Sequence, residues 1–489
     1  MKLTELLLGI PFYETASSIE NIAVHSIEVD SRNVKPGSLF VCIEGTKADG
    51  HEYAGEASHN GATAIISERP LNLATPTIVV PDTIRALAML AVRFYDHPTG
   101  NIPLIGVTGT NGKTTVTYLL ESIFGQWQKK TALVGTIQMK VGDSTFPVPN
   151  TTPDALFLQR AFHQMASDGV DQAIMEVSSH ALDMGRIYGC DYDVAVFTNL
   201  TQDHLDYHQN VEDYLWAKSL LFSQLGNTYD LKKPKFAVLN VDDDNFKKLS
   251  KSTAHHVVTY GLHKEAQVTA KNVKVTAEGT YFQLSAPSGT ISINSRLIGM
   301  FNVYNMLAAS TAAIVSGVPL TVIKEGLEKI TGVSGRFEPV YAGQNYSVIV
   351  DYAHTPDSLE NVLQAISGFA RRKVFVVVGC GGDRDRTKRP LMARTALNFA
   401  DYAIFTSDNP RTERPSSILA DMTEGLTETN FEVVEDRRAA IEKAVSFADE
   451  DDIVLIAGKG HETYQQVGYE TFNFDDRKVA RDAILAKEK

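Results

Sequence analysis

A short apolar run is followed by the stretch TGTNGKTT at residues 108–115, which combines glycines with a lysine and a threonine. Glycines allow backbone amides to approach an anion where a β-carbon would obstruct them. Lys113 adds a positive charge, and Thr114 adds a hydroxyl that can bind Mg²⁺. The generic pattern has glycine where this chain has Val107. The prediction of a phosphate-binding loop therefore rests on the Gly-Lys-Thr triplet between an expected strand and an expected helix, against the alternative of an ordinary glycine turn.

Two polar clusters follow other apolar runs. Glu176 ends one run, and TNLTQDHLDYH at 198–208 follows the next. Because ligands of open α/β sheets bind beyond the carboxyl ends of the strands, we expect both clusters to converge on the glycine-rich loop. Glu176 and His204 would suit Mg²⁺ beside a triphosphate; a paired buried glutamate and a capping histidine are the plainer interpretation. Zinc at His204 and His208 is disfavoured, because neither a cysteine set nor a metalloprotease glutamate accompanies them.

Four polar or glycine-rich turns follow apolar runs in the last third of the chain: DYAH at 351–354, GCGGDRDRTKRP at 379–390, DNPR at 408–411 and GKGHE at 458–462. We expect them to form one ligand-facing edge. The second turn carries four basic side chains and is either an anion site or a solvated charge run. In the third, Arg411 could bind a carboxylate through two parallel hydrogen bonds, whereas a turn shaped by proline is the alternative.

The elements that must position these residues alternate between strand and helix, which predicts an α/β fold. We expect a small N-terminal α/β domain at 1–100, a central P-loop domain with a mostly parallel sheet at 101–333, and a Rossmann-like doubly wound domain at 334–489. The central domain includes a short antiparallel excursion at 267–296. In the first domain, Asp30-Ser31-Arg32 follows an expected strand, and such a loop is ordinarily a surface turn.

Composition limits the classes of function. The 489 residues carry 46 basic and 59 acidic side chains, a net charge of −13, which disfavours a broad nucleic-acid interface or an anionic membrane surface. Three distant cysteines suggest neither a disulfide framework nor a cysteine zinc site, so a reducing cytoplasm is expected. The N-terminal MKLTELLLGIPF lacks a cleavage site and is interpreted as a packed amphipathic helix, and no run is long enough for a membrane span.

Together the motifs resemble the Mur ligases of peptidoglycan synthesis over essentially the whole chain, in the right order. The motifs that carry the resemblance are TGTNGKTT, MEVSSHAL, TNLTQDHLDYH, YLWAKSLLF, GMFNVYN, GRFE, DYAHTPDSL, GGDRDRTKRP, DNPR and GKGHETYQ. The likeness is strongest to the members that add meso-diaminopimelate. It implies an N-terminal domain that holds the UDP end of the substrate, a central ATPase and a mobile C-terminal domain that brings the amino acid.

The resemblance also implies a role for individual residues. The ATP-binding positions are Gly109, Thr110, Asn111, Gly112, Lys113, Thr114, Thr115, Asn302, Arg336 and Asp351. Thr114, Glu176 and His204 match Mg²⁺ ligands, and Lys218 matches a lysine that CO₂ converts into a carbamate ligand; Lys113, Glu176, His204 and Lys218 are the implied catalytic residues. Positions for the UDP-muramoyl-dipeptide are Ser31, Thr151, Thr152, Ser178 and Arg186. Positions for diaminopimelate are Arg384, Asp408, Asn409, Pro410, Arg411, Gly458 and Glu462.

The implied reaction is amide-bond formation through an acyl phosphate, with ATP converted to ADP and phosphate. A cytoplasmic monomer without nucleic-acid or membrane partners is expected. Three alternatives stay open: the same ligation with L-lysine, a folylpolyglutamate synthetase-like ligase, and a nucleotide-switch protein. The last is disfavoured because the chain has no Asn-Lys-x-Asp motif for reading guanine.

Overall fold

The computed structural model describes residues 1–45, 48–276 and 278–487. Its contacts divide the chain into two compact units. Unit 1 comprises Met1–Gly106, Lys129–Asp193 and Thr228–Lys235, and unit 2 comprises Val107–Gln128, Val194–Asn227 and Phe236–Lys489. The expected boundaries near residues 100 and 333 remain a prediction.

The N-terminal domain has a parallel four-stranded sheet in the order β1-β2-β3-β4. Its strands are β1 (Ser26–Glu28), β2 (Ser38–Val41), β3 (Ala64–Ser67) and β4 (Thr77–Val79), and its helices are α1 (Leu3–Leu6), α2 (Ala54–His59) and α3 (Thr83–Phe94). The expected amphipathic N-terminal helix is much shorter than predicted. It gives way to a 3₁₀ turn at Leu7–Gly9, where glycine and the following Pro11 disfavour a longer helix. Leu3, Leu6 and Leu7 are buried as expected, whereas Leu8 is exposed.

The central sheet runs in the order β15-β14-β13-β12-β11-β10-β5-β9-β6-β7-β8. The strands are β5 (Leu104–Thr108), β6 (Thr131–Val134), β7 (Met139–Val141), β8 (Ser144–Phe146), β9 (Gln172–Glu176), β10 (Val194–Phe197), β11 (Phe236–Asn240), β12 (His256–Gly261), β13 (Val268–Thr276), β14 (Gly279–Ala286) and β15 (Gly289–Ser295). The expected antiparallel excursion is present as β13 to β15, and β10 to β12 are parallel. The apolar runs at 102–107, 131–134, 171–177, 192–198 and 235–241 predict β5, β6, β9, β10 and β11, whereas β7, β8 and β12 are not predicted.

Seven helices accompany these strands in the described part of the chain: α4 (Lys113–Gln126), α5 (Ala155–Ser167), α6 (Ser179–Asp183), α7 (Val211–Ser223), α8 (Phe246–Ser250), α9 (Met300–Val315) and α10 (Leu320–Lys329). Helix α4 begins directly after the glycine-rich loop, as expected. Its residues Val116, Leu119, Leu120 and Ile123 are fully buried, which is the helical spacing that the sequence shows.

The C-terminal domain has a sheet in the order β16-β17-β21-β18-β19-β20, parallel except for β16. Its elements are β16 (Glu338–Pro339), β17 (Ser347–Asp351), α11 (Pro356–Ser367), β18 (Val374–Val378), α12 (Lys388–Phe399), β19 (Tyr402–Phe405), α13 (Pro415–Thr423), β20 (Phe431–Val433), α14 (Arg437–Phe447), β21 (Ile453–Ala457) and α15 (Asp476–Lys487). A hairpin of β22 (Tyr464–Val467) and β23 (Glu470–Asn473) is additional.

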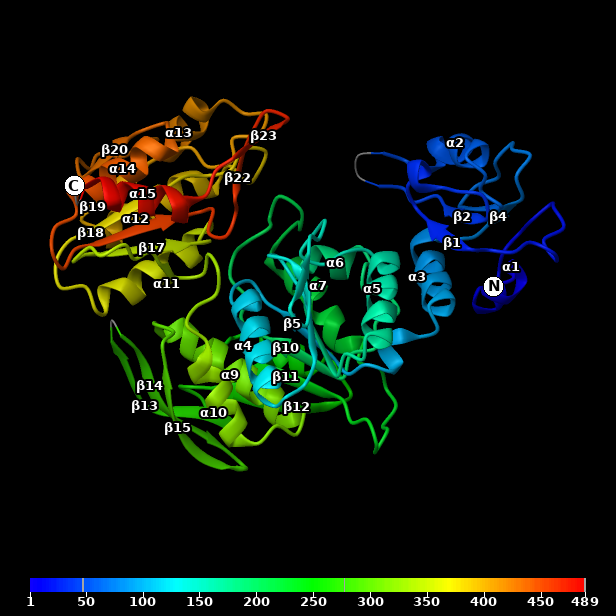
Figure 1. The fold of residues 1–489 in the computed structure, drawn as a ribbon, viewed down its shortest axis with the longest axis horizontal. Coiled ribbons are helices and arrows are strands. Elements are labelled where there is room, and N and C mark those ends of the chain that lie inside the picture. Colours follow the sequence, from blue (N-terminus) through cyan, green and yellow to red (C-terminus); the bar gives the residue numbers. More distant parts are fainter. Residues whose placement is uncertain (46–47, 277, 488–489) are drawn as a thin grey trace. The chain divides into compact units, whose positions relative to one another are not determined.

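Successive side chains of the buried strands point to opposite faces of the sheet, which explains why this domain has helices on both faces. In β18, Val374, Val376 and Val378 pack in one core with α11, α12 and α13, while Phe375 and Val377 pack in a second core with α14 and α15. Figure 1 shows α11 and α15 on opposite sides of β17. The predicted doubly wound architecture is confirmed. No helix among the described residues is both long and apolar enough to cross a membrane.

Candidate active site

The glycine-rich loop between β5 and α4 has two positions that only glycine suits. Gly109 has φ +147°, and a β-carbon there would lie 1.8 Å from the Thr198 hydroxyl oxygen. Gly112 has φ +88°, and its β-carbon would lie 2.3 Å from Oδ1 of Asn305. The loop is therefore pressed between the end of β10 and helix α9, with the amino terminus of α4 directly behind it. This arrangement can present backbone amides to an anion.

Two lysines meet at one carbonyl of this loop. Nζ of Lys113 donates to the carbonyl oxygens of Gly109 at 2.8 Å and Thr110 at 2.9 Å, and Nζ of Lys218 donates to the same Gly109 oxygen at 2.9 Å. Lys218 is 1% exposed and lies 4.3 Å from the ring centroid of Tyr214. Burial, and then repulsion from Lys113, lower the pKa of Lys218 well below its usual value. Lys218 is thus held toward its neutral, nucleophilic form.

Three residues outside the loop are expected to bind the nucleotide, and they differ in what they contact. Arg336 donates from Nη2 to the Thr114 hydroxyl at 3.0 Å, and its buried Nε has no partner among the described residues. Asn302 is buried and donates to the carbonyl of Ile298 at 2.9 Å. Asp351 accepts the backbone amides of Phe337 at 2.6 Å and Ala353 at 2.7 Å, and burial raises its pKa. Arg336 therefore joins the site directly, whereas Asp351 shapes the backbone beside it.

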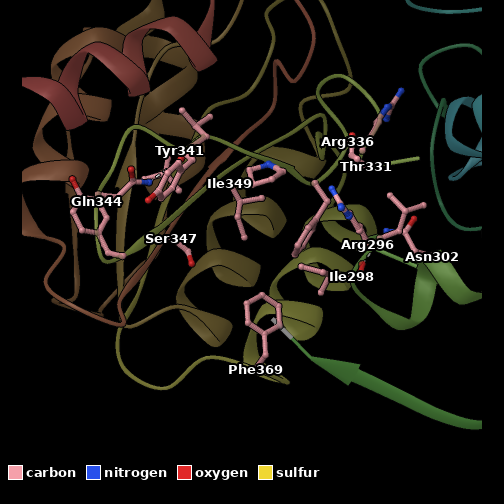
Figure 2. Close-up of a pocket in the computed structure, with 17 residues that line it drawn as sticks. Arg296, Ile298, Asn302, Thr331, Arg336, Tyr341, Gln344, Ser347, Ile349 and Phe369 are labelled. Carbon is pink, nitrogen blue, oxygen red and sulfur yellow. Dashed lines mark hydrogen bonds between the residues drawn. The ribbon is translucent and has the colours of Figure 1, made fainter. Parts of the chain in front are cut away.

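A cavity of about 160 Å³ opens beside these residues. Figure 2 shows Asn302 and Arg336 toward one end of the cavity and Tyr341 and Gln344 toward the other. The remaining walls are largely apolar, with side chains that include Ile298, Phe337, Val348, Ile349 and Phe369. A flat apolar group with polar edges fits this lining.

Asp357, at the start of α11, joins the C-terminal domain to the glycine-rich loop. Its Oδ2 accepts a hydrogen bond from Nδ2 of Asn111 at 2.9 Å and from the Thr201 hydroxyl at 3.0 Å. Burial raises the pKa of this carboxyl. Sequence reasoning missed Asp357, although it lies within DYAHTPDSL and follows a proline at the first helical position, where acidic residues favour a helix start.

His204 has φ +57°, and its Nε2 lies 3.4 Å from Oδ2 of Asp203. His208 is 2% exposed, and its ring lies 5.1 Å from that of Tyr214. In the described part of the chain no three His, Cys, Asp or Glu side chains are grouped as a metal site. Mg²⁺ commonly takes only one or two protein ligands and completes its shell with phosphate and water. The Thr114 hydroxyl at the start of α4 fits such a role.

Unit 1 brings Glu176 together with most of the expected UDP-substrate residues. Glu176 is fully buried, and Thr136 donates its amide to Oε1 at 2.9 Å and its hydroxyl to Oε2 at 3.0 Å. Thr136 also lies 3.1 Å from the Thr151 hydroxyl. Thr152 links the cluster by donating to the Glu176 carbonyl at 2.9 Å, and it accepts the amide of Ser178 at 3.0 Å. The paired, buried glutamate of the plainer interpretation is therefore present.

The two remaining residues of that set are placed differently. Arg186 donates to the Thr152 carbonyl at 3.3 Å and so borders the same cluster. Ser31 lies in the N-terminal domain and donates to Glu56 at 2.9 Å. The expected magnesium set takes Glu176 from unit 1 and Thr114 and His204 from unit 2, and as a set it remains a prediction.

The DNPR and GKGHE turns meet at the carboxyl ends of β19 and β21. Nδ2 of Asn409 donates to Oε2 of Glu462 at 2.8 Å. Arg411 has φ +50° and donates from Nη1 to the Gly382 carbonyl at 2.7 Å, with no other side-chain hydrogen bond among the described residues. Its backbone is held by the hairpin, because its amide donates to Gln466 at 3.1 Å and its carbonyl accepts from Gly468 at 2.6 Å. Most of the guanidinium donors are thus available to a ligand.

The arginines of the basic turn at 379–390 differ in whether an acidic side chain already pairs with them. Arg389 is fully buried and donates to Glu413 at 2.7 Å and Asp421 at 2.7 Å, and Arg386 also pairs with Asp421 at 2.9 Å. Arg384 is exposed, and its Nη1 donates to the neighbouring Asp383 carbonyl at 2.9 Å. Of the three arginines, Arg384 is the one free to meet an anion.

A buried ion pair fixes the two turns from behind. Arg437, the first residue of α14, donates to Asp476 through Nε at 2.8 Å and Nη2 at 2.7 Å, and neither side chain is exposed. The same guanidinium donates to the carbonyls of Ala457 at 2.9 Å and Ser407 at 3.4 Å, which precede GKGHE and DNPR. Arg437 therefore holds in place the residue that precedes each of the two turns.

We expect Arg437→Met to lower the free energy of unfolding of the C-terminal domain by about 3–5 kcal/mol, because it leaves a buried carboxylate unpaired. Urea denaturation measures the loss. The exposed neighbour Arg438 provides the control, since Arg438→Met should change stability by less than about 0.5 kcal/mol. The double change Arg437→Met/Asp476→Leu should recover much of the stability. Equal stability of wild type and Arg437→Met would contradict the role of this pair.

Comparison with known proteins identifies the family. Residues 107–313 match the Mur ligase middle domain, residues 335–460 the Mur ligase glutamate ligase domain, and residues 23–95 the Mur ligase family catalytic domain. The chain is 62% identical, over the full length of both chains, to the UDP-N-acetylmuramoyl-L-alanyl-D-glutamate--2,6-diaminopimelate ligase of Oceanobacillus iheyensis. It is 55% identical to the ligase of the same name from Bacillus cereus, over 96% of this chain and 95% of the relative.

Solved structures agree with this assignment. A ligase of the same name matches with a TM-score of 0.71 and 35% identity over all of both chains. The Mycobacterium tuberculosis folylpolyglutamate synthase complexed with ADP and AMPPCP has a TM-score of 0.62 over 76% of this chain and 92% of that chain, but at 18% identity it shows a shared fold alone. The three domain matches and the full-length identity place the chain in the Mur ligase family.

Proposed function

We propose that this chain is an ATP-dependent ligase that joins meso-diaminopimelate to the D-glutamate of UDP-N-acetylmuramoyl-L-alanyl-D-glutamate during peptidoglycan precursor synthesis. The observation that carries the proposal is the meeting of DNPR and GKGHE, where Asn409 contacts the Glu462 carboxylate and Arg411 of the same turn has unused donors. Relatives 52–62% identical to this chain bear the name of that ligase. We further propose that the enzyme acts as a cytoplasmic monomer.

The glycine-rich loop and its neighbours would bind ATP. Lys113 and the amino terminus of α4 suit the phosphates, and Arg336 bridges from Thr114 to the cavity that fits a base. The substrate carboxylate attacks the γ-phosphorus, ADP leaves, and an acyl phosphate forms. The amine of diaminopimelate then attacks the carbonyl carbon, and phosphate leaves. The contact of Asp357 with Asn111 and Thr201 would hold the C-terminal domain against the loop and help to exclude water.

Mg²⁺ would be held by Thr114, Glu176, His204 and the carbamate of Lys218, and when bound it would supply positive charge to the phosphates. A neutral Lys218 amine can add CO₂ and release one proton, which yields a carbamate with a negative charge. The buried, low-pKa environment of Lys218 supports this proposal. Thr151, Thr152, Ser178 and Arg186, which lie around Glu176, and Ser31 of the N-terminal domain would contact the UDP substrate.

Phosphate release that depends on the amino acid tests the function. Purified enzyme with ATP and UDP-muramoyl-dipeptide should release phosphate when meso-diaminopimelate is added, and far less with L-lysine. Replacement of the UDP substrate by a folate should give no turnover. Efficient use of L-lysine or of a folate would overturn the proposal in favour of one of the alternatives.

Arg411→Ala should lower kcat/KM for diaminopimelate by about 10²-fold or more, while ATP binding stays unchanged. The guanidinium can form two charge-assisted hydrogen bonds to the distal carboxylate, each worth roughly 1.5–3 kcal/mol. Arg414 is exposed three residues away, and Arg414→Ala should retain wild-type kinetics. A wild-type kcat/KM in Arg411→Ala would remove Arg411 from the amino-acid site.

A further inference from the structure

Lys459 is a buried cation within GKGHE to which the sequence analysis gave no role. Its side chain is 0% exposed. Nζ donates to Oδ1 of Asn409 at 2.9 Å and to Oε2 of Glu462 at 2.9 Å, and lies 5.4 Å from the ring centroid of Tyr464. A lysine is almost never fully buried unless its charge is paired. The charged groups around Lys459 should therefore account for its burial.

Lys459, Asn409 and Glu462 form a closed triangle of hydrogen bonds. Asn409 donates from Nδ2 to the same Oε2 of Glu462 at 2.8 Å, and its Oδ1 also accepts the amide of Gln466 at 3.0 Å. The side-chain amide of Asn409 is thus largely occupied by hydrogen bonds within the protein, and it positions Glu462. Oε2 of Glu462 has two donors, whereas Oε1 has none among the described residues. Oε1 is the oxygen that a ligand ammonium would meet.

The charge of Glu462 is consequently balanced before any amino acid binds. Arg384, Arg411 and Asp408 also lie near this site, since their charges, with that of Glu462, act on Tyr464. Asp383 faces Arg411, and the buried Arg437 acts on both Asp408 and Glu462. The direct hydrogen bond from Lys459 is therefore what balances Glu462 most closely in this site. A lysine side chain would add a further positive charge to it. The distal head of diaminopimelate, with a carboxylate and an ammonium, adds no net charge and offers its carboxylate to the arginines.

We propose that Lys459 is a specificity-determining residue: by neutralising Glu462 from inside the protein, it prevents a bare ammonium side chain from binding well and so favours an amino acid with a zwitterionic distal head. This inference rests on the proposed function. Lys459 acts through Glu462 and Asn409 and does not itself touch the substrate. Removal of Lys459 would leave the charge of Glu462 unbalanced. The side-chain ammonium of an L-lysine substrate would then gain a carboxylate partner that it lacks in the wild type.

The test compares kcat/KM for meso-diaminopimelate and L-lysine in wild type, Lys459→Met and Lys478→Met, with saturating ATP and UDP-muramoyl-dipeptide. We expect the ratio of the two values to fall at least tenfold in Lys459→Met, with KM for ATP within twofold of wild type. Lys478 is exposed on α15, and Lys478→Met should keep the wild-type ratio. In Lys459→Met/Glu462→Gln the gain for L-lysine should disappear, because the freed carboxylate is gone.

An equal loss of kcat/KM for both amino acids in Lys459→Met would overturn the inference, because a purely structural role predicts that result. If this variant does not fold, Lys459→Gln keeps a hydrogen-bond donor without the charge and should show the same fall in the ratio; an unchanged ratio there would also overturn it. A wild-type enzyme that does not ligate diaminopimelate would instead defeat the proposed function. The two failures are therefore distinguishable.

Discussion

Lys113→Ala is expected to lower ligation by about 10²–10³-fold, the usual cost of removing one group that stabilises charge in a transition state. Lys113 is partly buried, and its Nζ reaches two carbonyls of the glycine-rich loop. In the transferring phosphoryl group, charge spreads over oxygens that this ammonium would neutralise. The substitution removes little apolar packing, so the variant should fold.

Phosphate release under saturating substrates measures the loss, and circular dichroism verifies the fold. Lys248 is exposed on α8, so Lys248→Ala removes a lysine without touching the loop and should keep wild-type turnover. Near-normal turnover in a folded Lys113→Ala enzyme would mean that the loop does not bind the transferred phosphate. The loss should appear in kcat and not only in KM for ATP, because the interaction strengthens as the transition state forms.

The sequence predicted strands best where apolar runs are long and buried. The apolar runs at 131–134 and 402–405 predict strands, and the structure has strands with these bounds, because each is a largely buried segment between clear breaks. Several of the strands that were missed have weaker patterns. Strand β8 is exposed throughout, and the hairpin of β22 and β23 is largely exposed and polar, so neither shows a continuous hydrophobic run. Pairing with neighbouring segments determines such strands, and a local pattern does not record it.

Motifs also located the candidate site better than they described it. They predicted ligand-binding roles for Arg336 and Arg411, but the backbone strain at Arg411 and the hairpin that holds it depend on residues more than fifty positions away. Asp357, Arg437 and Lys459 were missed for a related reason. Asp357 and Arg437 act through partners that are distant in the sequence, and Arg437 and Lys459 are buried, whereas a charged residue in a sequence is ordinarily exposed. Burial of a charge becomes visible only in the folded structure.

Lys218→Ala should lower ligation by about 10²-fold or more, because the carbamate that we propose for this residue would be lost. The residue is suited to carbamylation by its surroundings. Its amine is buried beside the Tyr214 ring, it shares the Gly109 carbonyl with Lys113, and both burial and that second ammonium disfavour its charged form. A neutral amine is the form that reacts with CO₂, and the product replaces a positive charge by a negative one.

Two further measurements separate a carbamate from an ordinary buried lysine. A small carboxylate such as acetate should partly restore Lys218→Ala, whereas chloride at equal ionic strength should not, because only the carboxylate reproduces the lost oxygens. Wild-type enzyme equilibrated with ¹³C-labelled bicarbonate should show a carbamate carbon resonance that is missing from Lys218→Ala. If the variant is active without acetate and no such resonance appears in the wild type, the carbamate is disproved, and the lysine serves only to hold the Gly109 carbonyl.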